Sequence, residues 1–317
     1  MIARTKAALK FLWVLALFVT GALWLAKRKV RLGGKFVVLT FHRVLADEEF
    51  DDSSSLRGIR VRARTLEGFA AWANRHFEVV GSDDIPDEKP LERLRMVVTF
   101  DDGWIDTYTR AYPIAAKCGL PLTVFVCSGL AGESGPFWPE RVCRLVRAGV
   151  RGDEEKIIEE LKRLPEEERC TRLASLGAAG PEEDSLDRLM TWEQIRELHN
   201  AGVTIGSHTV THQILTGIST GEAYDELAGS RRHIEDELSS PCRLIAYPNG
   251  NVTPEIRGTA AAAGYRRGFT TMPGFWQAGS DPLLIPRVNI WEGKLIGPAG
   301  RFSRAMAEYS IFWQTPK

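Results

Sequence analysis

Residues Val97-Val98-Thr99-Phe100-Asp101-Asp102-Gly103 form the segment around which the chain is organised. The first four favour a buried β-strand, and two carboxylates follow where that strand should end. Aspartate is a poor strand residue, and two adjacent carboxylates repel each other. Asp-Asp-Gly is also ordinary turn chemistry, so the triplet alone is compatible with a simple strand end.

A second polar cluster follows another short apolar run. Val203-Thr204-Ile205-Gly206 precedes Ser207-His208-Thr209-Val210-Thr211-His212. On a helical turn, two histidines four positions apart share one side and lie within reach of one cation. Carboxylates after one strand and paired histidines after another predict a metal site at the shared mouth of a parallel sheet.

Size and composition restrict the class of protein. A chain of 317 residues can bury a large core, as one large α/β domain or two smaller ones. Acidic and basic residues number 41 each and no basic stripe is visible, so we expect no nucleic-acid partner. The five cysteines are odd in number, scattered and without a Cys-x-x-Cys pair, which argues against a disulfide framework and a thiolate zinc site.

Residues 1–35 are predicted to be a membrane anchor with basic flanks. At about 1.5 Å per residue, the uncharged apolar run from Phe11 to Ala26 barely crosses a hydrocarbon core about 30 Å thick, and it does so with help from Leu9 and snorkelling lysines. A cleaved signal peptide is the alternative, but Trp24-Leu25-Ala26 is a poor cleavage site. We therefore expect an uncleaved, single-pass transmembrane helix. The positive-inside rule and the free cysteines favour a cytoplasmic catalytic domain.

From Phe36 onward, strand patterns alternate with helix patterns. Such alternation predicts a parallel sheet or barrel, whose active site lies at the carboxyl ends of the strands. Every polar cluster named above lies at such an end. Residues 151–189 differ, because they are rich in Glu, Arg and Leu and show helical periodicity. We expect a solvated helical insertion there, with an active-site lid as the alternative. The predicted strands cover 36–41, 96–100, 122–127, 203–207, 244–247, 268–271 and part of 284–290.

Two motifs together resemble a known family. Thr-Phe-Asp-Asp-Gly at 99–103, followed later by Ser-His-Thr-Val-Thr-His at 207–212, is similar to the polysaccharide deacetylases, carbohydrate esterase family four. These are metal-dependent carbohydrate de-N-acetylases. The resemblance runs from about Phe36 to Ile290 and includes 39–44 and 246–250. It implies a distorted (β/α) barrel of about seven parallel strands over residues 36–317, with the helical insertion at about 151–189.

The resemblance also implies roles for individual residues. Asp102, His208 and His212 match the metal ligands, and Asp101 matches the general base. The backbone N–H of Tyr247 matches an oxyanion-hole donor. Two imidazoles and a carboxylate leave coordination positions open for water and a substrate carbonyl, as a catalytic site needs. The implied cofactor is a divalent metal, Zn²⁺ by default, although Co²⁺, Ni²⁺ or Fe²⁺ also suits this ligand set.

The chain departs from the family pattern in two places. The family arginine that orients the base is absent from 244–248, and the histidine that serves as general acid is replaced by Arg287. We hypothesise that Arg287 orients Asp101, with a surface or helix-capping role as the alternative. His42, at the end of the first strand, is predicted to line the metal pocket as an acid or extra ligand, unless it is only a hydrogen-bonded strand-end residue.

Trp104 follows the Asp-Asp-Gly motif and is predicted to stack on a sugar ring, with core packing equally open. The predicted function is a membrane-anchored, metal-dependent hydrolase that removes N-acetyl groups from amino sugars of a polysaccharide, oligosaccharide or lipid-linked glycan. One alternative is a deformylase of a lipid-linked amino sugar, and another is a glycan-binding relative that has lost activity. The expected partners are an N-acylated glycan and a membrane, and the resemblance favours the extracytoplasmic side.

Overall fold

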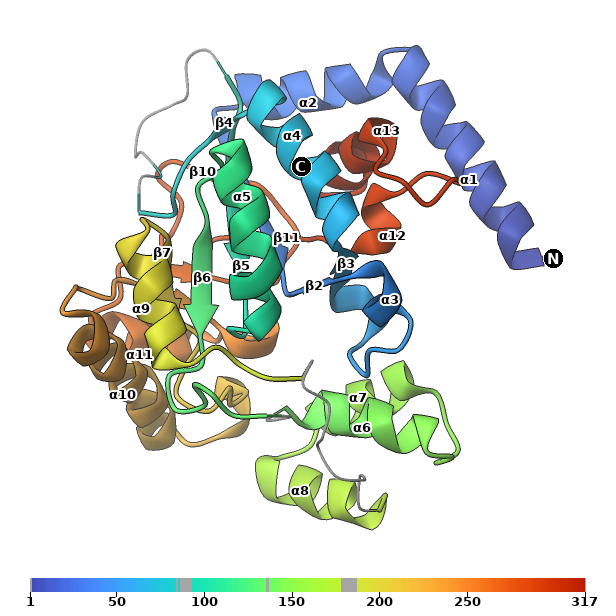
Figure 1. The fold of residues 1–317 in the computed structure, drawn as a ribbon. Helices are drawn as coiled ribbons and strands as arrows, with labels where there is room; N and C mark the ends of the chain where they lie inside the picture. The colour runs from blue at the N-terminus through green and yellow to red at the C-terminus, as the bar shows by residue number, and fades with distance from the viewer. Residues whose placement is uncertain (1, 84, 86–92, 135–136, 178–186, 317) are drawn as a thin grey trace.

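The computed structural model describes residues 2–83, 85, 93–134, 137–177 and 187–316 (Figure 1). Within them, nine strands form one curled sheet that is mostly parallel, a half-barrel of the α/β class. Its central order is β1, β5, β6, β7, β8 and β9, and every pair of neighbours in this order is parallel. These strands cover Lys35–Phe41, Arg95–Phe100, Thr123–Val126, Thr204–Ser207, Leu244–Ala246 and Arg267–Phe269.

Three short strands complete the sheet. β4 (Glu78–Val79) pairs in parallel with β5, and β11 (Val288–Asn289) pairs in parallel with β1. β10 (Trp276–Gln277) runs antiparallel to β1. A separate two-stranded sheet joins β2 (Arg43–Leu45) to β3 (Arg60–Arg62). The parallel sheet and its strand order confirm the predicted fold class.

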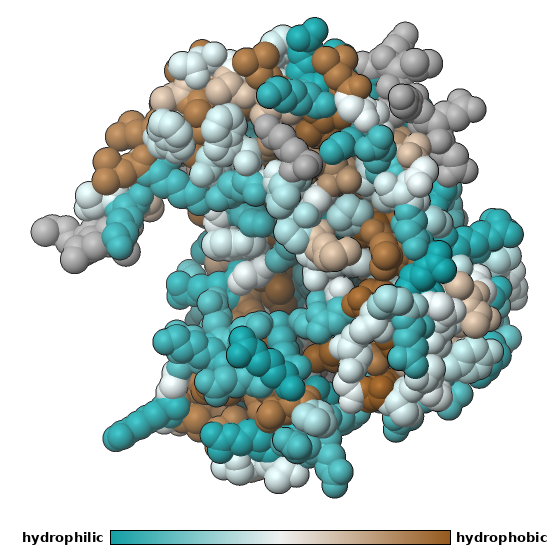
Figure 2. All heavy atoms as spheres, turned by 180° about the vertical axis from the view of Figure 1, so that it is seen from behind, coloured by the Kyte–Doolittle hydropathy of each residue, from teal (hydrophilic) through white to brown (hydrophobic). Residues whose placement is uncertain are grey.

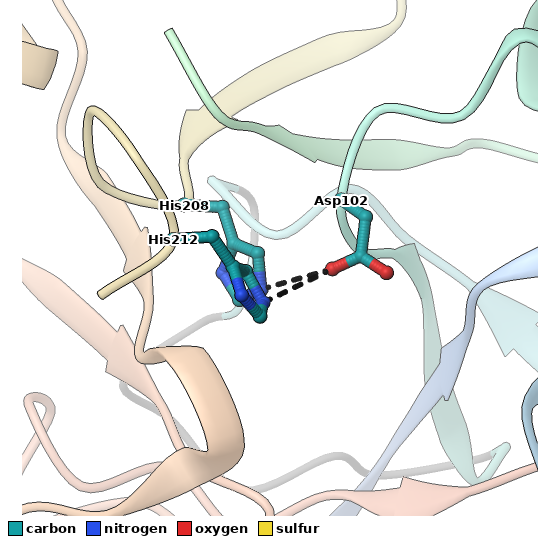
Figure 3. Close-up of side chains that lie close together, drawn as sticks. All are labelled: Asp102, His208 and His212. Carbon is teal, nitrogen blue, oxygen red and sulfur yellow. Dashed lines mark ion pairs between the residues drawn. The ribbon is translucent and has the colours of Figure 1, made fainter. Parts of the chain in front are cut away.

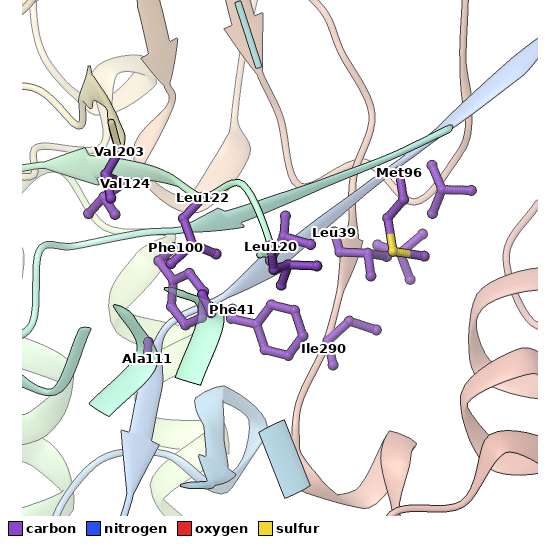
Figure 4. Close-up of a cluster of buried hydrophobic side chains, with 14 of the residues drawn as sticks. Leu39, Phe41, Met96, Phe100, Ala111, Leu120, Leu122, Val124, Val203 and Ile290 are labelled. Carbon is purple, nitrogen blue, oxygen red and sulfur yellow. The ribbon is translucent and has the colours of Figure 1, made fainter. Parts of the chain in front are cut away.

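The central strands are buried along almost their whole length, as expected for a parallel sheet that helices cover. In β1, every residue after Lys35 is buried. Phe41 of β1 stacks on Phe100 of β5 with ring centroids 5.3 Å apart (Figure 4). The larger helices around the sheet are α4 (Ala63–His76), α5 (Tyr112–Cys118), α9 (Trp192–Asn200), α10 (Thr220–Leu238) and α11 (Pro254–Ala262) (Figure 1).

The segment 285–289 connects the two ends of the curled sheet. Ile285 forms a parallel bridge with Phe269 of β9, and three residues later Val288 pairs with Leu39 of β1. Arg287 therefore lies between two backbone-paired residues and is buried. The chain then continues into the short helices α12 (Glu292–Leu295) and α13 (Arg304–Glu308).

The N-terminal region is a bent helix pair rather than the continuous helix predicted over 11–26. α1 (Ile2–Val19) and α2 (Ala22–Leu32) meet at 64°, and Gly21 between them has φ 79°. That left-handed conformation is readily adopted by glycine and interrupts the helical hydrogen bonding. Among the described residues, neither helix alone has the length and hydropathy of a membrane span, whereas the bent pair together does.

The predicted insertion is helical and larger than expected. α7 (Glu154–Lys162) and α8 (Glu166–Ser175) fall within 151–189, and α6 (Trp138–Arg147) precedes that range but joins the same group. These helices share a small apolar core separate from that of the sheet, and residues 178–186 lie outside the described part of the chain. Figure 1 shows the three helices beyond the carboxyl end of β6, away from α2. The core residues are Val142, Cys143, Ile158, Leu161 and Leu173.

Candidate active site

Asp102, His208 and His212 converge at the carboxyl ends of β5 and β7 (Figure 3). Asp102 Oδ1 lies 3.3 Å from His208 Nε2 and 3.4 Å from His212 Nε2. One ligand atom from each residue lies within 4.8 Å of the other two. Parallel pairing brings these distant residues together, because neighbouring strands end at the same edge of the sheet.

The two histidines do not lie on a helical turn, contrary to the sequence prediction. They lie in a loop in which Thr209 has φ 68° and His212 has φ 63°. The Thr209 hydroxyl accepts a hydrogen bond from the His212 backbone N–H at 3.0 Å. This local bond stabilises a tight turn that brings the two imidazole centroids to 4.8 Å from each other.

The surroundings of the cluster fit a divalent cation. His208 Nδ1 lies 2.7 Å from the Ala246 carbonyl oxygen, so Nδ1–H donates there and Nε2 is the ring nitrogen that faces Asp102 Oδ1. Asp102 Oδ2 accepts a hydrogen bond from Trp104 Nε1–H at 2.9 Å, which leaves Oδ1 facing the imidazoles. Burial raises the pKa of Asp102, but hydrogen bonds with His208 and His212 outweigh burial and hold it well below its ordinary value. An ionised carboxylate and two imidazole nitrogens form a suitable donor set.

Asp101 is paired with Arg287, as the hypothesis required of an orienting arginine. Arg287 Nη1 and Nη2 each donate to one Asp101 carboxylate oxygen at 2.7 Å. Nε of Arg287 also donates to the Thr270 carbonyl at 2.9 Å, which holds the guanidinium in place. Burial raises the pKa of Asp101, but the Arg287 charge, followed by His208, outweighs it and lowers the pKa. Asp101 is therefore ionised at neutral pH. Arg287 is buried, so its alternative role as a surface residue is wrong.

Asp101, Asp102, His208 and His212 line a cavity with a volume of about 350 Å³, and His42 lines it too. Its Nε2 lies 4.0 Å from Asp101 Oδ2. Its Nδ1 is buried and has no hydrogen-bond partner in the described part of the molecule. His42 is not part of the cluster of three possible metal ligands found among the described residues. It therefore flanks the Asp101 carboxylate.

Tyr247 does not offer the backbone N–H that the resemblance implied. That N–H donates to the Phe269 carbonyl at 3.0 Å, in line with the pairing of β8 and β9, so it is not directed at a substrate oxygen. The Tyr247 hydroxyl donates to the Leu283 carbonyl at 3.1 Å. Pro248 has no N–H, so the next backbone donor is Asn249, which lines the cavity and has φ 57°.

Trp104 is fully buried, so the predicted sugar stacking is wrong. One face of its ring lies against Arg43, whose guanidinium carbon is 4.0 Å from the ring centroid. Arg43 is itself buried and donates to Asp106 at 2.7 Å and Asp187 at 2.8 Å. The Trp104 indole thus packs between a buried ion-pair network and the Asp102 carboxylate that it hydrogen-bonds.

Sequence reasoning missed Glu140 and the contribution of α6. Glu140 is buried in the cavity wall together with Phe137 and Trp138. Burial first, and then the Asp102 and Asp187 charges, raise the pKa of Glu140 to about 8. Its position in the amphipathic helix α6 gives no sequence signal of this environment.

An ionised aspartate beside an Asp-His-His cluster, at the carboxyl edge of a parallel sheet, defines the site of a hydrolase. The family model described as polysaccharide deacetylase matches residues 88–268. The chain therefore belongs to the polysaccharide deacetylase family, as its motifs indicated.

Individual relatives are distant in sequence. One relative is the Bacillus subtilis (strain 168) protein YxkH, which is named as a polysaccharide deacetylase. It is 22% identical over 284 residues, which cover 88% of this chain and 79% of that protein. The Streptococcus pyogenes deacetylase PplD, solved with acetate, is 21% identical with a TM-score of 0.59, over 84% of this chain and 96% of that one. IcaB from Ammonifex degensii is 19% identical with a TM-score of 0.58, over 89% and 97%. At these identities the solved structures show similarity of fold.

Replacing Arg287 with methionine should destabilise the protein by about 3–5 kcal/mol at neutral pH, because Asp101 becomes an unpaired buried charge. The pKa of Asp101 is below its unfolded value in the native protein and should rise above it in R287M. The loss should therefore be largest near pH 7.5 and shrink as the pH falls toward the unfolded pKa of about 3.9.

Urea unfolding of the metal-free protein at several pH values measures this difference. Arg257→Met is the matched control, because Arg257 makes a similar two-bond pair with Asp281 at the surface. Its loss of stability should be much smaller and should vary less between pH 5 and 7.5. Equal losses in the two variants would contradict the assigned role of Arg287.

Proposed function

We propose that the protein is a metal-dependent de-N-acetylase that hydrolyses N-acetyl groups on the amino sugars of a glycan. The observation that carries this proposal is the convergence of Asp102, His208 and His212 beside the ionised Asp101. Membership of the polysaccharide deacetylase family supports the reaction class. Zn²⁺ is the proposed metal, since imidazole and carboxylate ligands suit it.

A divalent ion held by Asp102, His208 and His212 would polarise the amide carbonyl and lower the pKa of water. In this proposal Asp101 takes the proton from the attacking water. The two hydrogen bonds from Arg287 support that role, because they keep the carboxylate charged and oriented. A carbon–oxygen bond forms and the carbon–nitrogen bond breaks. The nitrogen leaves as an amine after receiving a proton, for which we propose His42 as the donor. Acetate is the other product.

The proposed reaction predicts a sharp separation between two kinds of variant. Asp101→Asn should lower kcat for acetate release by about 10²- to 10⁴-fold while metal content stays near one equivalent, because Asp101 is outside the ligand cluster. His208→Ala should lose the metal itself. Acetate release from N-acetylated oligosaccharides, together with metal analysis of each purified variant, tests both expectations.

The same assay decides between the proposal and its alternatives. Release of formate from N-formylated sugars without release of acetate would mean that the enzyme removes formyl rather than acetyl groups. A metal-loaded protein that binds glycans but releases neither acid would be a binding protein. Unchanged turnover and metal content in His42→Ala would exclude His42 as the proton donor.

Trp104 should support metal binding through its hydrogen bond to Asp102. Trp104→Phe keeps an aromatic ring but removes the donor, so affinity for Co²⁺ or Zn²⁺ should fall by about tenfold. Trp72→Phe is the control, because Trp72 is buried among Phe69 and Phe77 and its Nε1 has no partner among the described residues. Competition with a chelator measures both affinities, and equal affinities would contradict the role of Trp104.

We further propose that the N-terminal helix pair attaches the protein to a membrane, with the catalytic domain on the extracytoplasmic side. Leu12 and Trp13 of α1 are 60% and 56% exposed, and Trp24 of α2 is 57% exposed. Figure 2 shows the hydrophobic residues of this region on the outer surface. Fractionation of cells should find the full chain with the membranes. A topology reporter at the C-terminus should then place the catalytic domain on the extracytoplasmic side. Recovery of the chain away from the membranes would contradict the attachment.

A further inference from the structure

A second cavity adjoins the active-site cavity. It has a volume of about 760 Å³ and lies between the α7–α8 turn and the loops at 214–218 and 249–251. Lys162, Ile214 and Asn249 line both cavities. Space for a ligand therefore continues from the metal-ligand cluster outward along the helical insertion.

The helical insertion forms part of both cavity walls. Ile158 and Lys162 of α7 line the active-site cavity, called the inner cavity below. Arg163 and Arg169 line the second cavity, called the outer cavity. α8 is bonded to the loop that carries His212. Gln213 donates to Glu166, and Arg169 Nη2 donates to the Gln213 side-chain oxygen at 3.5 Å. The position of this wall is thus tied to the residue next to a candidate metal ligand.

The outer cavity is basic. Lys162, Arg163 and Arg169 line it, against the single acid Glu159. Lys162 pairs with Glu159 at 2.8 Å. Arg163 is exposed and has no ion-pair partner among the residues that the structure describes. A concave surface with an excess of positive charge attracts anions and raises their local concentration.

We propose that α7, α8 and the turn between them form a basic subsite for the glycan unit next to the one that is deacetylated, and that this unit carries an anionic substituent, a carboxylate or a phosphate. This inference rests on the proposed function. The insertion is then a substrate-binding wall, which differs from both the solvated segment and the lid considered from the sequence.

The test compares kcat/KM for acetate release from N-acetylated oligosaccharides of equal length that are neutral, carboxylate-bearing or phosphate-bearing. The native protein should prefer an anionic oligomer over the neutral one by about fivefold or more, and added salt should reduce this preference. The single sugar, which cannot reach the outer cavity, should show no such preference. Arg163→Glu should remove most of it, since an attraction becomes a repulsion.

Lys156→Glu is the matched control. Lys156 is an exposed residue of α7 that lines neither cavity, so the same change of charge should leave the preference intact. Equal kcat/KM for neutral and anionic oligomers in the native protein would overturn the subsite while leaving the deacetylase proposal standing. An equal effect of Lys156→Glu and Arg163→Glu would also overturn it, because the effect would then come from overall charge.

Absence of turnover on every substrate would count against the proposed function and not against the subsite. A binding measurement then tests the subsite directly. Calorimetric titration of Asp101→Asn with the same oligomers should show tighter binding of the anionic ones. Adding Arg163→Glu should weaken that binding by about fivefold. Indifference of the affinity to Arg163→Glu would overturn the subsite without any reference to catalysis.

Discussion

The pairing of Asp101 with Arg287 is the interaction on which the rest of the site depends. A carboxylate that is almost fully buried would ordinarily take up a proton, because a low-dielectric surrounding penalises charge. Two short hydrogen bonds from one guanidinium reverse that tendency and leave the Asp101 carboxylate ionised at neutral pH. The same arginine lies on the segment that bridges β9 and β1. The bridge between β9 and β1 and the ionisation of Asp101 therefore depend on the same segment.

Other buried charged groups around the site also have hydrogen-bonded partners. Arg43 pairs with Asp106 and Asp187 and lies against Trp104, whose indole N–H then holds Asp102. Each ionised group has a partner, so the geometry of the cluster is set by residues behind it. Glu140 is the exception among the acids of the cavity wall, since burial and nearby negative charges raise its pKa. The cavity thus combines carboxyl groups whose pKa values are shifted in opposite directions.

The helical insertion extends this arrangement outward. α6 and α7 supply walls to the inner cavity, and α8 is bonded to the loop that carries His212. The carboxyl edge of the sheet holds Asp101 and the candidate metal ligands, whereas the insertion lines the outer cavity, where neighbouring parts of a substrate would lie. Chemistry and substrate selection would then be carried by different parts of the chain.

Several features could be predicted from local sequence. The strand run Phe36–Phe41 is almost wholly apolar, and two polar motifs each follow such a run. The α/β class and the meeting of Asp102 with His208 and His212 could therefore be predicted. The family was also recognisable from those motifs. Local prediction was wrong at the turn between His208 and His212, which the Thr209 hydroxyl stabilises, and at Gly21, where a left-handed backbone conformation interrupts the helix.

By itself, the sequence determined which segments form buried strands and which chemical groups end them, because side-chain type and periodicity act over a few residues. Tertiary structure decided what those groups do. It buried Trp104 against Arg43, used the Tyr247 N–H in the sheet and placed Glu140 in the cavity wall. Burial, hydrogen-bond satisfaction and pKa depend on neighbours that are distant in the chain, and only folding brings those neighbours together.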